Sequence, residues 1–127
     1  MVDPVTIGYG TNKWLFDSNT DFISIFRPSN GTGTYSLHDT TDSDFLVPVG
    51  KKFIMLGMAF DTAEISMYKN TTPDSTSGGS LVWGQEDDDT NNPKHVWIEF
   101  PASNYVNVFG GASAGLMGTA WGIETTT

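Results

Sequence analysis

The 127-residue sequence contains no cysteine. This absence excludes a disulfide scaffold, a thiol nucleophile and any zinc or iron–sulfur site with cysteine ligands. The sequence also has no apolar stretch near the roughly 18 residues that a membrane-spanning helix needs. Its first residues, MVDPVTIGYG, show neither the charged nor the apolar region of a signal peptide. The sequence therefore predicts a protein made in the cytoplasm.

Positive charge is scarce as well, because six Lys and Arg residues stand against fifteen Asp and Glu residues, for a formal net charge of −9. Only Lys51 and Lys52 are neighbours, so there is no basic stripe to follow the phosphates of a nucleic acid. An anionic membrane surface would repel such a chain. The composition predicts that the protein binds neither nucleic acid nor membrane.

Aromatic residues and glycines are abundant, with eight Phe, four Tyr, four Trp and 14 Gly. No segment shows a 3.6-residue period, and strand-like runs recur about every 10 to 15 residues between turn signals. The predicted strands cover residues 5–9, 14–16, 21–27, 35–38, 45–47, 51–60, 64–69, 80–85, 95–100, 104–109 and 116–124. The pattern predicts one all-β domain over residues 1–127, an antiparallel two-sheet β-sandwich of the jelly-roll type.

The stretch KKFIMLGMAF, residues 51–60, lacks the alternation expected of a strand with one wet face. One face is expected to pack between the sheets, and the other to need cover from a loop, a further strand or another subunit. The run FISIF at residues 22–26 is likewise apolar on both faces. In HVWIEF, residues 95–100, alternation predicts Val96, Ile98 and Phe100 on the core face and Trp97 on the outer face. We expect a homo-oligomer rather than loop cover, with these interface residues: Phe53, Met55, Met58, Phe60, Trp97 and Phe109.

Signs of catalysis are few. The two histidines, His38 and His95, belong to different predicted strands, and GxSxG, HExxH and a phosphate-binding glycine loop are all missing. A hydrolase with a carboxylate pair is the least favoured of three hypotheses, because sequence cannot place two carboxylates roughly 5 to 10 Å apart. We predict a protein that is not an enzyme and that has no catalytic residues.

The most polar segment is EDDDTNN at residues 86–92. Three of its side chains have the i, i+2, i+4 spacing that opens calcium loops: Asp87, Asp89 and Asn91. The EF-hand pattern fails, because Asn92 and Ile98 occupy the positions that require Gly and Glu. We expect a solvated acidic loop and no cofactor. The alternative is a looser calcium site that draws on another loop, through Asp39, Asp42 or Asp44.

A second functional hypothesis is a carbohydrate-binding module. Trp83 and Trp97 would be its stacking platforms, with the 86–92 loop as a polar or calcium-bearing rim, and the ring of Trp121 could also stack on sugar. Core or interface positions are the commoner fate of tryptophans in strands. The sequons at Asn30 and Asn70 are interpreted as turn-rich loops.

Two phrases carry a family resemblance. FLVPVGKKFIMLGMAF resembles a strand entry of β-sandwich proteins from tailed-phage and other virions, in which a Pro-x-Gly-Lys turn leads into a long hydrophobic strand. GLMGTAWGIET is similar to the last strand of such modules, and the resemblance covers roughly residues 45–127. It implies a jelly-roll or tumour-necrosis-factor-like homotrimer that serves as a capsid decoration, head-fibre or tail-fibre module. Its partners would be other virion proteins or surface glycans, and it implies no catalytic residues.

Overall fold

The computed structural model describes residues 5–9, 12–16, 21–30, 33–60, 65–85, 93–110 and 116–127, in which every regular element is a β-strand. The strands are β1 (Val5–Tyr9), β2 (Asn12–Phe16), β3 (Asp21–Asn30), β4 (Gly33–Ser36), β5 (Lys51–Phe60), β6 (Ile65–Asn70), β7 (Ser80–Gln85), β8 (Lys94–Phe100), β9 (Tyr105–Gly110) and β10 (Leu116–Thr126). The predicted all-β class is confirmed. None of the described residues belongs to a helix that could cross a bilayer.

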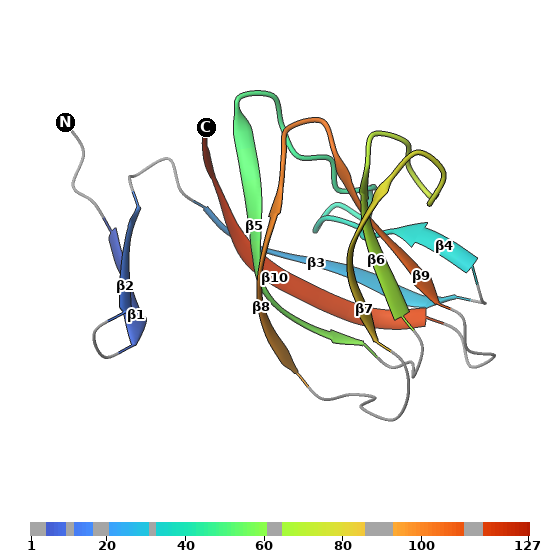
Figure 1. Cartoon of the computed structure of the whole chain (residues 1–127), viewed down its shortest axis with the longest axis horizontal. Coiled ribbons are helices and arrows are strands. Elements are labelled where there is room, and N and C mark those ends of the chain that lie inside the picture. The colour runs from blue at the N-terminus through green and yellow to red at the C-terminus, as the bar shows by residue number, and fades with distance from the viewer. Residues whose placement is uncertain are drawn as a thin grey trace.

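Eight strands form two antiparallel four-stranded sheets (Figure 1). Sheet I has the order β3-β10-β5-β8, and sheet II has the order β4-β9-β6-β7. From β3 to β10, every connection passes from one sheet to the other except the β6–β7 hairpin. Strands β1 and β2 pair with each other as a hairpin, which Figure 1 shows beyond one end of the two sheets. The predicted two-sheet sandwich is confirmed.

The hydrophobic core lies between the two sheets, because each strand directs alternate side chains inward. In β8 the buried and exposed positions alternate as the sequence predicts, with Val96, Ile98 and Phe100 toward the core. Aromatic rings fill its centre, where Phe53 lies 5.3 Å from the Phe45 ring and 6.0 Å from the Phe100 ring, measured between centroids. Burying aromatic rings of this size is a major contribution to stability.

Most predicted strands agree with the observed ones to within two residues at each end, and two predictions differ more. Pro28 was expected to end a strand, but β3 continues through Asn30. This is possible because β3 is an edge strand, and because its register with β10 shifts next to Pro28, where a ladder hydrogen bond is not required. Residues 45–47 make no strand: only Leu46 bridges to Tyr105, while the amide of Val47 donates to Asn104.

The lack of alternation in β5 has a structural cause. Leu56 is an extra residue, because Gly57 and Met55 have consecutive partners in β10 and Leu56 has none. A bulge of this kind reverses the alternation in the residues that follow it. The inward-facing residues of β5 therefore have odd numbers before the bulge and even numbers after it: Phe53, Met55, Met58 and Phe60.

Four of the six predicted interface residues are therefore wrong: Phe53, Met55, Met58 and Phe60. Their side chains are at most 6 % exposed, and all four belong to the core of their own chain. Regular alternation over residues 51–60 predicts apolar side chains on both faces of the strand, whereas the bulge directs the apolar residues of both halves to the core. Residues that do lie on the outer face of β5 include Ile54 and Leu56.

Deleting Leu56 should strongly destabilise the protein. Without the extra residue, either Phe53 and Met55 or Met58 and Phe60 must turn out of the core. Exposing a Phe or Met loses roughly 1.5–3 kcal/mol each, so we expect the free energy of unfolding to fall by about 3–6 kcal/mol in denaturant titrations. Leu56→Ala keeps the bulge and should lose far less. Equal losses for both variants would show that the Leu56 side chain matters rather than the bulge.

Candidate functional site

His38 lies in a polar cluster rather than in an open catalytic site. Its Nδ1 is 2.9 Å from Oδ1 of Asp42, and its Nε2 is 3.1 Å from Oδ1 of Asp44. Arg27 also hydrogen-bonds Nε2 of His38, while its guanidinium lies 4.7 Å from the centroid of the Tyr35 ring. Both ring nitrogens thus contact neighbouring side chains. The cluster ties the segment after β4 to β3, at the bridge between His38 and Phe26.

The predicted calcium site stays a prediction, because its three ligands are not among the described residues. Asp87, Asp89 and Asn91 lie outside the described ranges. Asp39 Oδ1 accepts hydrogen bonds from the hydroxyl and amide of Thr41, at 2.6 and 2.9 Å, and the hydroxyl bond is the main cause that lowers the pKa of this carboxyl. In the part of the chain that the structure describes, no group of three or more His, Asp or Glu side chains could hold a metal ion.

The outer face of sheet II is covered at one end by the chain's own loop, residues 71–79. Asn107 of β9 is fully buried there, donating through Nδ2 to the Ser75 carbonyl at 2.7 Å and accepting from the Ser36 hydroxyl at 2.6 Å. Ser36 and Asp74 exchange two further bonds, in which each backbone amide donates to the other's side-chain oxygen. These polar groups are satisfied within the chain, so loop 71–79 is held against this end of sheet II by its own hydrogen bonds.

Asn70, the asparagine of one sequon, belongs to the same network. Its side chain is buried, its Nδ2 donates to the carbonyls of Ser75 and Ser77, and its Oδ1 accepts from the Thr72 amide. An attached glycan would have to break these bonds. Asn70 itself ends β6, and only the two threonines of the motif belong to loop 71–79.

Sheet I has a different outer face, which carries apolar side chains. The strand register arranges this face in two rows across the four strands: Phe22–Ile123–Ile54–Glu99 and Ser24–Trp121–Gly57–His95. Ile54 and Ile123 are buried although they face away from the core. We call four of the side chains of this face the outer-face patch: Phe22, Leu56, Trp97 and Trp121.

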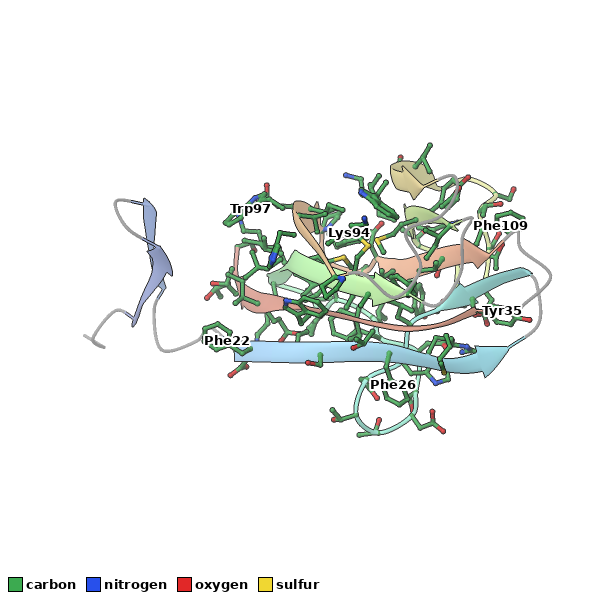
Figure 2. All side chains as sticks on the ribbon, turned by 90° about the horizontal axis from the view of Figure 1, so that it is seen from below. Phe22, Phe26, Tyr35, Lys94, Trp97 and Phe109 are labelled. Atoms are coloured by element: carbon green, nitrogen blue, oxygen red, sulfur yellow. The ribbon has the colours of Figure 1, made fainter. Side chains whose placement is uncertain are left out.

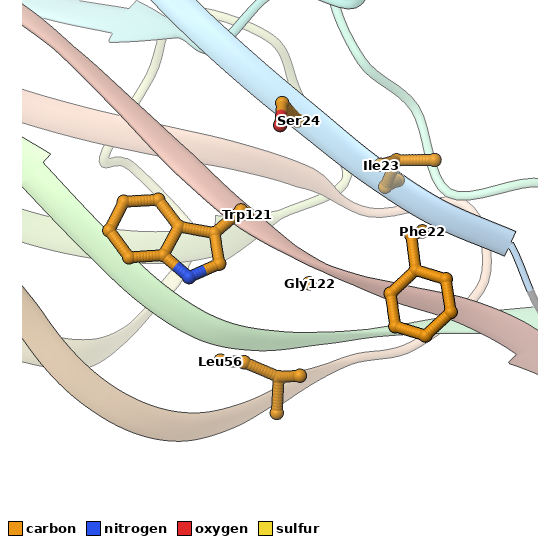
Figure 3. A pocket seen from close by; sticks show the side chains of 6 residues that line it. All are labelled: Phe22, Ile23, Ser24, Leu56, Trp121 and Gly122. Carbon is orange, nitrogen blue, oxygen red and sulfur yellow. The ribbon is translucent and has the colours of Figure 1, made fainter. Parts of the chain in front are cut away.

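Trp121 lies across Gly57 in the middle of sheet I. A Cβ at Gly57 would lie 2.3 Å from Cε2 of the indole, so the ring can occupy this place only because residue 57 is glycine. Trp121, Leu56 and Phe22 border a shallow depression of about 260 Å³ (Figure 3). Its lining is mainly apolar, which suits an apolar side chain better than a polar ligand.

Phe22 and Trp97 place exposed aromatic surface on the two edge strands of the same sheet. Phe22 in β3 is 62 % exposed, and Trp97 in β8 is 46 % exposed. Figure 2 shows both side chains toward the same end of the molecule's long axis, the end where the hairpin lies. The predicted outer position of Trp97 agrees with this exposure.

Two other predicted residues lie elsewhere. Phe109 is 41 % exposed, but it lies on the outer face of sheet II beside Ser66, so it does not join Trp97 in one surface. Trp83 pairs with Met67 and packs against the core. Trp83 is therefore wrong as a sugar-stacking platform, because its ring belongs to the interior side of its sheet.

Sequence reasoning did not assign Phe22, Leu56 and Trp121 to one surface. The signal for Phe22 was present, because FISIF is apolar on both faces. Joining these residues requires the register of β3, β10 and β5, which comes from strands about 30 to 100 residues apart in the chain. A single sequence does not carry that information.

No protein-family model, curated protein or solved structure matches this chain. Its function is therefore inferred from its own residues.

Gly57→Ala tests the contact between β5 and Trp121. The added methyl would collide with the indole, so the ring must move outward or the strands must shift. We expect a loss of about 1–3 kcal/mol in the free energy of unfolding, as for other overpacked sites, together with a red shift of tryptophan fluorescence. Gly84→Ala is the matched control, because a Cβ there would only meet the Ile65 carbonyl oxygen at 3.8 Å. An unchanged emission spectrum in Gly57→Ala would contradict the assigned position of the Trp121 ring.

Proposed function

We propose that this chain is a non-enzymatic structural module that works as a homo-oligomer and assembles through the outer-face patch of sheet I. The observation that carries the proposal is the difference between the two outer faces. Loop 71–79 covers one end of sheet II with satisfied polar groups, whereas sheet I presents aromatic rings on both edge strands. An antiparallel sheet with one wet face usually carries polar residues there.

The chemistry of the patch supports a protein partner. Aromatic side chains are enriched where proteins meet, and a few of them in the centre of an interface supply most of the binding energy. Phe22 and Trp97 each expose part of an aromatic ring, and Trp121 and Leu56 lie between them on the same face. Covering these rings removes apolar surface from water, which favours association.

The strand order supports the more specific inference of a jelly roll. Counted from β3, sheet I has the order 1-8-3-6 and sheet II the order 2-7-4-5. Nested pairing of the first strand with the last, and of the second with the seventh, belongs to the double-sheet architecture that capsid and lectin domains share. We infer a setting in which many copies meet, such as a trimeric capsid decoration or fibre module.

Carbohydrate binding is a second candidate, favoured by one observation. Trp97 presents an exposed ring between His95 and Glu99, whose side chains share its face of β8 and could hydrogen-bond sugar hydroxyls. The shallow, mainly apolar depression beside Trp121 supports assembly more than it supports carbohydrate binding.

Phe22→Asp tests the assembly proposal. The change places a charge in the patch and removes an aromatic ring; loss of one dominant interface residue typically costs about 2 kcal/mol or more of binding free energy, or roughly a 30-fold weaker association. We expect wild-type protein to form an oligomer of the 13.8 kDa chain, and Phe22→Asp to shift toward the monomer in light scattering after size exclusion.

Leu81→Asp is the matched control, because Leu81 is 60 % exposed, like Phe22, but belongs to β7 of sheet II. This variant should keep the wild-type mass. A monomeric wild-type protein, or an equal loss of mass in both variants, would contradict the patch as the assembly surface.

The carbohydrate candidate predicts a change of tryptophan fluorescence on addition of glycans, and loss of that change in Trp97→Ala. Trp83→Phe should keep the response, because the Trp83 ring packs against the core. Fluorescence that is unchanged across a broad set of glycans would leave assembly as the surviving candidate.

A further inference from the structure

Strand β3 is an edge strand of sheet I, and one half of its outer edge has no partner strand in the part of the chain that the structure describes. The segment after β4 bridges to β3 at Phe26, where the backbones of Phe26 and His38 exchange two hydrogen bonds. In Figure 2, β3 lies along one margin of the sandwich, with Phe22 near its end and Phe26 farther along. No described strand pairs with this edge at residues 22–25.

The register shows which backbone groups face this edge. Successive residues of an antiparallel strand direct their N–H and C=O groups to opposite sides. Phe26 directs both groups to His38, away from β10. The pairing of β3 with β10 is regular over residues 21–27, so Phe22 and Ser24 direct their N–H and C=O groups to the same side as Phe26. Four backbone groups therefore face the open edge.

This part of β3 lacks the features by which proteins protect a sheet edge. Charged side chains, proline and bulges all discourage pairing with another chain. The run FISIF, residues 22–26, has no charge and no proline, and its register with β10 has no bulge. The other edge of sheet I, β8, carries Lys94, His95 and Glu99. Of these two edges, β3 is the one that favours an added strand.

A depression lies beside the same residues of β3. It has a volume of about 360 Å³ and is bordered by residues 22–25 on one side and by Asp39, Thr40 and Phe45 on the other. A strand added to this edge would lie over the depression and direct alternate side chains to the core side of the sheet. An apolar side chain suits this place, because Ile23 and Phe45 border it.

We propose that β3 pairs with β3 of a second copy about a twofold axis, so that two copies of sheet I form one continuous eight-stranded sheet. This inference rests on the proposed function and names the contact through which two outer-face patches meet. The two β3 strands are antiparallel, and the contact uses the same residues of both copies. Phe22 of each copy lies opposite Ser24 of the other, and Ile23 lies opposite Ile23.

The backbone hydrogen bonds select this register. With Phe22 opposite Ser24, two hydrogen-bonded pairs form, and every N–H and C=O group of these two residues is bound in both copies. A register with Ser24 opposite Ser24 sets Phe22 against Phe26, whose backbone is already bound to His38. A register with Phe22 opposite Phe22 sets Ser24 against Thr20, which precedes β3.

The side chains favour the same register. Ile23 of the second copy lies over the depression, beside Ile23 and Phe45 of the first copy. On the outer face, the two Phe22 rings are diagonal neighbours across the junction, at a spacing that aromatic side chains can bridge. Phe22 has the most exposed ring of the outer-face patch, at 62 %, and the pairing covers part of it.

The charges near the twofold axis partly offset one another. Asp21 of one copy comes opposite Ile25 of the other, on the side where Asp39 borders the depression. Lys51 Nζ lies 4.0 Å from Asp21 Oδ2 and offsets part of this negative charge. The repulsion that remains is between carboxylates at the surface, where salt screens it.

Ser24→Pro tests the backbone contact. Proline has no N–H, and the N–H of Ser24 faces the open edge, so the change removes half of the new hydrogen bonds and leaves the ladder with β10 intact. We expect the variant to stay folded by circular dichroism and to shift toward the monomer in light scattering after size exclusion. Ser24→Ala is the matched control, because it keeps the N–H and should keep the wild-type mass.

The measured masses separate this inference from the proposed function. A twofold contact closes at two copies, so the wild-type protein should contain an even number of chains. A wild-type trimer, or a Ser24→Pro variant that keeps the wild-type mass while Phe22→Asp loses it, would support the proposed function and overturn the inference. If the wild-type protein is a monomer, or if Phe22→Asp also keeps the wild-type mass, the proposed function itself fails.

The second experiment does not depend on how the strand tolerates proline, and it uses the absence of natural cysteines. In the proposed register the two Ile23 residues form a pair without hydrogen bonds, with Cα atoms about 4.5 Å apart, which a disulfide can bridge. We expect Ile23→Cys to form a disulfide-linked dimer on a non-reducing gel after mild oxidation.

Ser24→Cys is the control for the disulfide. Ser24 is more exposed than Ile23, but the two copies of Ser24 are diagonal neighbours roughly 7–8 Å apart, beyond the reach of a disulfide. This variant should give much less dimer. An equal yield from Ser24→Cys would mean random collision, and the lack of a linked dimer from Ile23→Cys would mean that β3 does not meet β3; either result overturns the inference.

Discussion

The structure depends on the contact of the Trp121 indole with the backbone at Gly57. Because residue 57 has no side chain, the ring can lie on β5 at the point where Leu56 makes the bulge. The bulge in turn directs both halves of β5 to one core. A Cβ on Gly122, next to Trp121, would lie 2.0 Å from the Ile54 carbonyl oxygen, so β10 also approaches too closely for another residue. The close approach of these two paired strands thus directs the apolar side chains of β5 to the core and leaves the Trp121 ring on the outer face.

The outer faces of the two sheets differ because their strands are connected differently. In sheet II the β6–β7 connection is long enough to fold back, and its carbonyls are bound by Asn70 and Asn107. In sheet I the neighbouring strands are joined only through sheet II, so no short hairpin connection lies within it. On this face Ile54 and Ile123 are nevertheless buried, while Phe22 and Trp97 are left exposed on the edge strands. The difference is a consequence of topology as much as of composition.

Sequence patterns predicted what is local. Alternation in HVWIEF correctly placed Val96, Ile98 and Phe100 in the core and Trp97 outside, since it needs only neighbouring residues. The prediction for KKFIMLGMAF was wrong, because a bulge changes the alternation and no sequence pattern marks its position reliably.

The prediction for Trp83 was wrong for a related reason, since both faces of its strand are partly apolar and alternation does not show which one faces the core. The patch joins β3, β5, β8 and β10, and only strand order brings them together. The acidic segment at residues 86–92 stays a prediction.

The net charge of −9 restricts how copies can meet. Two sandwiches that pack face to face bring like charges together around the patch, and this repulsion opposes the burial of the rings. Salt screens such repulsion over a Debye length of about 8 Å at physiological ionic strength, whereas the burial of apolar rings does not depend on charge. In an assembly through the outer-face patch, added salt should therefore strengthen the association rather than weaken it.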